Sequence, residues 1–229
     1  MIKVLFIFFF ISFFHANTHH YQVEFMGINV AKVTMSHRDT VFANHPAIIV
    51  AFSANTQAVS SFFYPVDNHY EIIHSIDTHQ ILSFKKTTTQ PGLSNQLFTD
   101  LKENLPYYHN SQISIPNNAI TIFTLFHLMA FDLLEKESFI IEREGLHYEA
   151  SLLKSPNGSH LHKNKLELIS KSTTDKIGIL EHTDIFTWAV FKENATRTIW
   201  VNTQEQRIEK CNFNVGLFSL TAEYLFTDE

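Results

Sequence analysis

The chain has 229 residues, of which 45% are hydrophobic, 14% aromatic and 17% charged, and its formal net charge is -6 with histidine counted as neutral. This composition excludes an intrinsically disordered or collagen-like chain. The negative charge argues against nucleic acid as a partner, because proteins bind its phosphates with an excess of Lys and Arg. The single cysteine, Cys211, cannot form an internal disulfide, and we expect its thiol to be buried.

Residues 1–18 have the layout of a secretory signal peptide. Lys3 precedes an apolar run from Val4 to Phe14, which contains one polar residue, Ser12, and which small and polar residues follow. A membrane-spanning helix needs about 20 apolar residues, and this run is about half as long. We therefore expect cleavage within a few residues of position 18. The mature chain, 19–229, is expected to be one β-rich domain in the periplasm or cell envelope, with no transmembrane span after signal removal.

Period-two alternation of apolar and polar residues predicts antiparallel strands with one buried face. The first examples are 21–25 and 31–35, and turn residues such as Gly27 separate them. Tyr70, Ile72 and Ile76 are expected to share one face. The same alternation recurs over 146–152 and 218–224.

One segment breaks this pattern, because residues 120–134 are apolar on nearly every face and contain neither Gly nor Pro. Asn118 offers an N-cap, so we predict a helix over about 118–135. A competing strand assignment for 120–126 stays open, because several of its residues are β-branched. A helix that is apolar all round must be enclosed. The predicted fold is therefore mainly β: a curved antiparallel sheet or open barrel of many strands packed around this one apolar helix.

Motifs for catalysis are missing from the sequence. No two of the six glycines lie close enough to form a phosphate-binding loop or a G-x-S-x-G elbow. Glu142 and Glu144 precede a glycine turn and are expected to face solvent. We therefore predict no catalytic residue and no cofactor.

The 14 histidines raise the alternative of a metal site, but their spacing gives little support to it. His69, His74 and His79 are five residues apart, which places successive side chains on opposite faces of a strand. His160 and His162 would share a face, and they are the weak metal-ligand candidates. His127 is expected to be a core histidine with a hydrogen-bond partner.

Two aromatic clusters allow two structural interpretations. The residues 107–108 and 62–64 are able to line a ligand groove, although packing in the core or on an edge strand is commoner.

Three stretches resemble the exported bacterial proteins of the domain of unknown function 3108 family (DUF3108). The stretch 21–35 resembles its opening strand pair, 60–77 its aromatic-Pro-Val segment, and 198–225 its closing strands. Ala130 stands where the family helix often carries an arginine. The resemblance implies an exported, mostly antiparallel β protein without an established activity. It marks six pattern positions with an expected structural role: Gly27, Pro65, Tyr70, Asp77, Trp200 and Gly216.

These observations favour a non-enzymatic envelope protein whose partner is an apolar small molecule or lipid, or an envelope protein. The alternatives are a metal-assisted hydrolase that uses loop histidines, and a purely structural envelope module.

Overall fold

The structure is a computed structural model that describes residues 17–56, 64–102, 105–109, 111, 113–134, 137–156, 160–171 and 179–226. The predicted signal peptide therefore lies almost wholly outside the described residues. The described elements, in chain order, are β1 (Asn17–Phe25), β2 (Ile28–Phe42), β3 (His45–Thr56), β4 (Asp67–Ser75), β5 (Ile81–Gln90), β6 (Leu93–Lys102), β7 (Leu105–Tyr108), β8 (Ala119–Ile120), α1 (Ile122–Ala130), β9 (Ser138–Arg143), β10 (Leu146–Pro156), β11 (Leu161–Ser170), α2 (Ile185–Phe191), β12 (Thr196–Asn202), β13 (Arg207–Val215) and β14 (Phe218–Tyr224).

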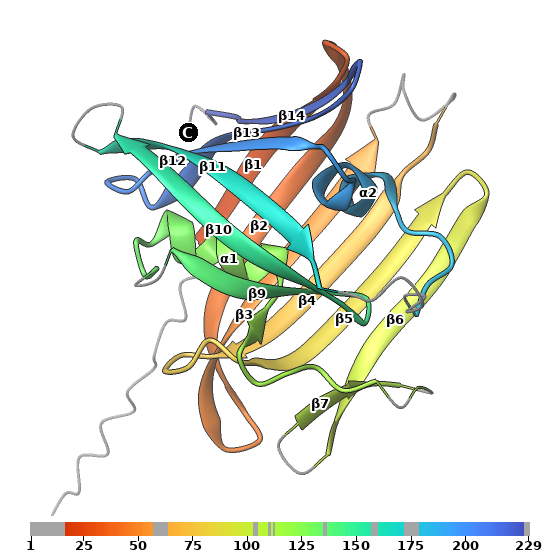
Figure 1. Ribbon diagram of the computed structural model, residues 1–229, viewed down its shortest axis with the longest axis vertical. Helices are drawn as coiled ribbons and strands as arrows, with labels where there is room; N and C mark the ends of the chain where they lie inside the picture. Colours follow the sequence, from red (N-terminus) through yellow and green to blue (C-terminus); the bar gives the residue numbers. More distant parts are fainter. Residues whose placement is uncertain are drawn as a thin grey trace, which may run out of the picture.

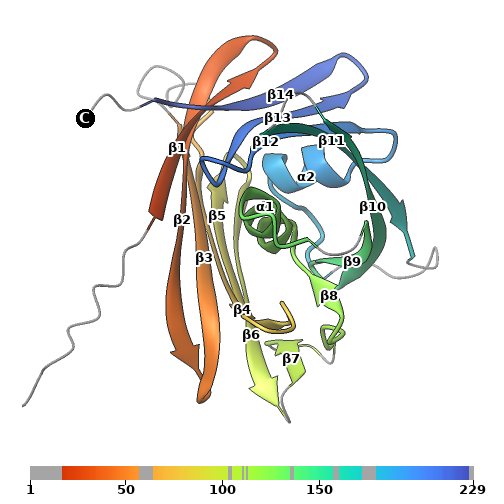
Figure 2. The same ribbon diagram turned by 90° about the vertical axis from the view of Figure 1, so that its left-hand side faces the viewer.

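These strands form one sheet in the order β7-β6-β5-β4-β3-β2-β1-β14-β13-β12-β11-β10-β9-β8. The first strand pairs with the last, with Tyr21 opposite Tyr224, so two meanders join along the β1–β14 seam (Figure 1). Neighbouring strands are antiparallel, apart from the short parallel pair β8–β9. The sheet curls without closing, and Figure 2 shows β1 to β6 as one wall, β9 to β14 as the other, and both helices between them. The predicted open, curved antiparallel sheet around an apolar helix is confirmed.

The strand faces follow the alternation in the sequence. Tyr21, Met35, Ile72 and Leu152 are all buried on the inner face. Ile76 was expected on the same face as Ile72, but it lies past the end of β4 and is 39% exposed.

The apolar helix is shorter than predicted. It spans Ile122–Ala130, and all nine residues are buried, as expected for an enclosed helix. Its N-cap is Thr121 rather than Asn118, because the Thr121 hydroxyl accepts a hydrogen bond from the Thr124 amide at 3.0 Å. Residues 119–120 instead form strand β8, so the alternative strand assignment holds only up to Ile120.

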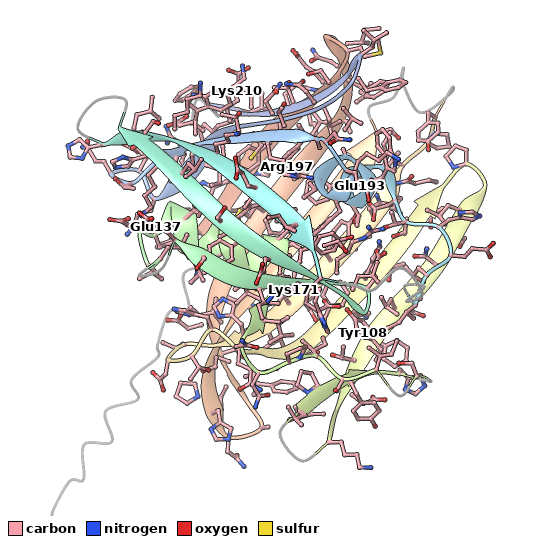
Figure 3. The ribbon with its side chains drawn as sticks, viewed as in Figure 1. Tyr108, Glu137, Lys171, Glu193, Arg197 and Lys210 are labelled. Carbon is pink, nitrogen blue, oxygen red and sulfur yellow. The ribbon has the colours of Figure 1, made fainter. Side chains whose placement is uncertain are left out.

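A second helix, α2, was not predicted. Its sequence, IFTWAVF, is β-branched and aromatic, and seven residues are too few to show a helical period. The Asp184 carboxylate caps it by accepting a hydrogen bond from the Thr187 amide at 2.9 Å. At its other end, Arg197 on β12 donates hydrogen bonds to the carbonyl oxygens of Val190, Lys192 and Ala195 (Figure 3). No helix in the described ranges is both long and apolar enough to cross a membrane.

Candidate functional site: an apolar cavity

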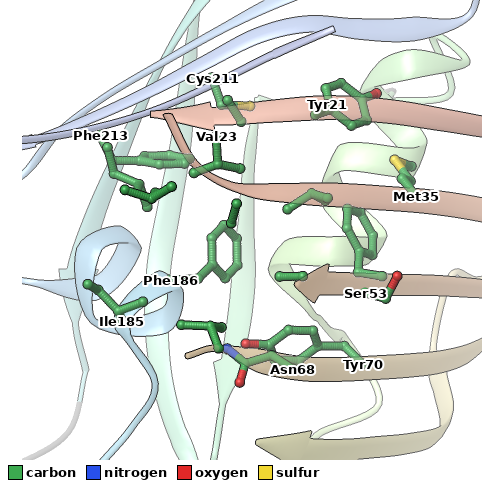
Figure 4. A pocket seen from close by; sticks show the side chains of 18 of the residues that line it. Tyr21, Val23, Met35, Ser53, Asn68, Tyr70, Ile185, Phe186, Cys211 and Phe213 are labelled. Carbon is green, nitrogen blue, oxygen red and sulfur yellow. The ribbon is translucent and has the colours of Figure 1, made fainter. Parts of the chain in front are cut away.

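A cavity of about 460 Å³ lies between the inner face of the sheet and the two helices. Strands β1 to β4 form one side, β13 and β14 another, and α1 and α2 complete it (Figure 4). The alternation of the strands explains the lining, because each strand turns its apolar residues inward. The only polar side chains that the described lining includes are those of Ser53, Asn68, Cys211 and three tyrosines.

Aromatic contacts position the helices against this cavity. Phe123 on α1 packs on Phe52 and Tyr70, with ring centroids 4.7 Å and 4.5 Å apart. Phe186 on α2 stacks on Phe123 at 5.5 Å, and also contacts Phe213 on β13 at 6.2 Å. These contacts fix α1 and α2 against each other and against the inner face of the sheet.

A buried ionic cluster fixes α2 to the sheet. The Lys86 ammonium on β5 is 1% exposed, and it donates hydrogen bonds to Glu144 and, at 2.5 Å, to Asp184. Burial alone would raise the pKa of Asp184, but the Lys86 ammonium and hydrogen bonds from Lys86 and Thr187 hold it below its usual value. Because Asp184 is also the N-cap, the cluster sets the place where α2 begins.

The expectation that Glu142 and Glu144 face solvent is wrong, because both are 3% exposed. Glu142 accepts hydrogen bonds from the Tyr108 hydroxyl at 2.5 Å and from the Gly145 amide at 2.7 Å. Burial is the main reason that the pKa of Glu142 rises to about 7. The sequence predicted the turn at Gly145, but the side chains of the two acids before it point into the interior.

Four imidazoles, one of them on α1, lie close together. His127 lies 5.0 Å from His37 and 5.4 Å from His74 between ring centroids, and His74 lies 6.0 Å from His79. His127 is 2% exposed, and neither of its ring nitrogens has a hydrogen-bond partner among the described residues, contrary to the expectation of a partner. Burial, together with the neighbouring imidazoles, lowers the pKa of His127 to about 3, and burial lowers that of His74 to about 4.

The weak metal candidates lie elsewhere. His160 is exposed before β11, and His162 faces a second, smaller pocket of about 270 Å³ beside the C-terminal end of α1. Within the described ranges, no three or more His, Cys, Asp or Glu side chains are placed to hold a metal ion.

The pattern positions of the family resemblance are scattered. Gly27 and Gly216 occupy hairpin turns with positive φ, Pro65 and Asp77 are exposed, and Trp200 carries the Lys163 ammonium 5.6 Å above its ring. Tyr70 alone of the six lines the cavity. Of the aromatic clusters, Tyr64 lines the cavity, Tyr108 is in the core, and 62–63 lie outside the described residues.

Cys211 lies in the cavity wall and is 5% exposed, as expected for a buried thiol. Burial raises its pKa well above the usual value, so the thiol is protonated and a poor nucleophile.

No protein-family model matches the chain, and no curated protein does. Among solved structures, the chain is similar to the crystal structure of a beta-barrel-like protein of domain of unknown function DUF1849 from Brucella abortus. The two share 7% sequence identity over 92% of this chain and 95% of that one, with a TM-score of 0.49. This similarity carries no functional information, and the resemblance to DUF3108 stays a prediction.

Proposed function

We propose that this chain is an exported envelope protein that binds an apolar ligand between its curved sheet and its two helices. The observation that carries the proposal is the apolar cavity of about 460 Å³. Its volume lies within the range of roughly 300–1,000 Å³ that is typical of small-molecule sites. The signal-like segment 1–18 supports the location.

Packing physics favours an occupant. The cavity is partly open to solvent, so its apolar wall faces water when no ligand is bound, which is unfavourable. An apolar surface holds water poorly, since water needs two to four polar partners. A hydrocarbon ligand would restore dispersion contacts to rings such as Phe123 and Phe186, which line the space without filling it.

The lone cysteine gives a direct assay. Cys211 is the only thiol of the chain and lies in the cavity wall, so its labelling rate reports occupancy without an engineered probe. The raised pKa of this thiol makes labelling slow in the empty protein, and a ligand in the cavity slows it further. The protein is first stripped of bound lipid under denaturing conditions and refolded, and the extract is analysed by mass spectrometry. The neutral apolar dye N-phenyl-1-naphthylamine is then titrated. The proposal expects saturable fluorescence enhancement and slower Cys211 labelling at the same dye concentrations.

A cavity-filling variant tests the location. Ala54 on β3 lines the cavity, and Ala51 on the same strand does not, so Ala54→Phe and Ala51→Phe form a matched pair. Ala54→Phe should weaken dye binding at least tenfold while its melting temperature stays equal or rises, since it fills a void. Ala51→Phe should bind like wild type. Dye binding that neither variant changes, or that leaves Cys211 labelling unaffected, would place the ligand elsewhere and refute the proposal.

A further inference from the structure

The cavity offers polar atoms to a ligand but no charge. Asn68 on β4 lines it, is 1% exposed, and its Oδ1 has no hydrogen-bond partner among the described residues. Figure 4 shows Asn68 beside Tyr70 at one end of the cavity, with Tyr21 at the other. The Tyr21 hydroxyl is likewise buried and has no partner among the described residues. Buried polar atoms are nearly always hydrogen-bonded in native proteins, so these atoms indicate a ligand that supplies the missing hydrogen bonds.

None of the described lining residues carries a charge. Charged groups lie behind Tyr70, where the Lys86 ammonium is 5.8 Å from the Tyr70 ring centroid, and near Tyr21, where Arg207 pairs with Glu209 at 2.9 Å. The Lys86 ammonium already binds Glu144, Asp184 and the Thr183 hydroxyl, the last at 3.2 Å. Arg143 lies 3.5 Å from Glu144, so both cations of this cluster, Lys86 and Arg143, are paired with acids. An anionic ligand would therefore meet no uncompensated cation here, and a cationic ligand would meet no acid in the described cavity wall.

We propose that the ligand is an uncharged lipid alcohol, whose hydrocarbon part fills the cavity and whose hydroxyl binds the Asn68 amide. This inference rests on the proposed function and adds the chemical class of the ligand. A hydroxyl both donates and accepts, so it complements the amide with its oxygen or its nitrogen turned inward. A carboxylate or ammonium in the same place would be desolvated without a partner, which disfavours fatty acids and cationic lipids.

The volume limits the size of the buried part. The volume of about 460 Å³ lies in the lower half of the range of roughly 300–1,000 Å³ that small-molecule sites span, so the buried part of the ligand is small. A twelve-carbon chain with one hydroxyl fits this space.

The test compares three probes with the same twelve-carbon chain: 1-dodecanol, dodecanoate and dodecyltrimethylammonium. Each probe is titrated against wild-type protein at pH 8, the two ions below their micelle concentrations and dodecanol below its solubility limit. Binding is measured by displacement of N-phenyl-1-naphthylamine and by protection of Cys211. The inference expects dodecanol to bind at least tenfold more tightly than either ion. Dodecanoate or the ammonium binding as tightly as dodecanol would overturn it. Failure of the dye itself to bind would instead refute the proposed function.

The second arm tests the role of Asn68. Asn68→Leu should weaken dodecanol binding about tenfold without weakening the dye, because only the alcohol loses a hydrogen bond. Asn55→Leu, at an exposed position of β3, is the matched control and should leave both affinities unchanged. If Asn68→Leu does not fold, Asn68→Ala replaces it with the same expectation. Unchanged preference for dodecanol over the dye in either Asn68 variant would contradict the assignment.

Discussion

The buried histidine cluster gives a quantitative prediction through the substitution His127→Phe. A phenyl ring matches the aromatic surroundings of His127, which packs against Phe131 at 4.9 Å, and removes two nitrogens that have no described partner. At pH 8, where the imidazole is neutral in both states, the variant should be at least as stable as wild type. The expected gain is on the order of 1 kcal/mol, from the loss of a buried unsatisfied polar group.

The larger effect appears on acidification. The pKa of His127 is about 3 in the folded protein and 6.5 when unfolded. On acidification, His127 therefore binds a proton at a higher pH in the unfolded state than in the folded state. The contribution of neutral His127 to stability is intact above pH 6.5 and is lost as the pH falls from there toward 3. Linkage between these values gives a loss of ~2 kcal/mol at pH 5 relative to pH 8. His127→Phe removes that loss.

The effect of His127 is seen in the difference in unfolding free energy between wild type and His127→Phe, and not in the pH profile of wild type alone. Glu142 acts in the opposite direction, because its pKa is raised to about 7 in the folded state, so its contribution falls as the pH rises from 4.5 to 7. Urea unfolding of wild type and His127→Phe at pH 5, 6, 7 and 8 should show a stability gap that widens by about 2 kcal/mol toward pH 5. His45→Phe, at an exposed position of β3, should follow wild type. Parallel curves for wild type and His127→Phe would refute the reasoning.

Three further substitutions test the buried charges and the strand faces. Lys86→Met leaves Glu144 and Asp184 buried without their cation and should lower the free energy of unfolding by about 3–5 kcal/mol in urea titrations. The control Lys85→Met, at an exposed position, should change it by less than about 0.5 kcal/mol. Equal effects of the two substitutions would contradict a buried ion cluster. Glu142→Gln keeps an acceptor for Tyr108 but cannot ionise, so its unfolding free energy should fall less than that of wild type between pH 5 and pH 7, and an unchanged pH profile would show that Glu142 is solvated. Leu220→Asp places a charge on the cavity face of β14 and should cost about 2–4 kcal/mol, measured by thermal melting; a melting temperature within a few degrees of wild type would mean that this side chain faces outward.

The strands and their inner faces were predictable because alternation is a local signal. Residues such as Tyr21 and Met35 show by their spacing which side they bury. The apolar helix was recognisable for the same reason, but its start was not. Residues 119–120, just before the helix, form a strand because Ala119 pairs in parallel with Ile140 on β9. No local pattern in the sequence predicts this pairing.

The charged interior was not predictable from the sequence. Lys86 lies 58 residues from Glu144 and 98 from Asp184, so no spacing rule connects them. Each residue alone has the character of an exposed strand or turn position. Asp184 itself was the one local signal, since aspartate is a favoured residue at the start of a helix. The histidine cluster likewise forms only because β2, β4 and α1 meet.

The most direct test of the central claim is a crystal structure of the lipid-stripped protein soaked with 12-bromo-1-dodecanol. The account predicts continuous density for one chain between α1, α2 and β1–β4, with the hydroxyl at Asn68 and an anomalous bromine peak inside the cavity. A cavity closed by movement of Phe186, or bromine bound only on the outer surface, would contradict it.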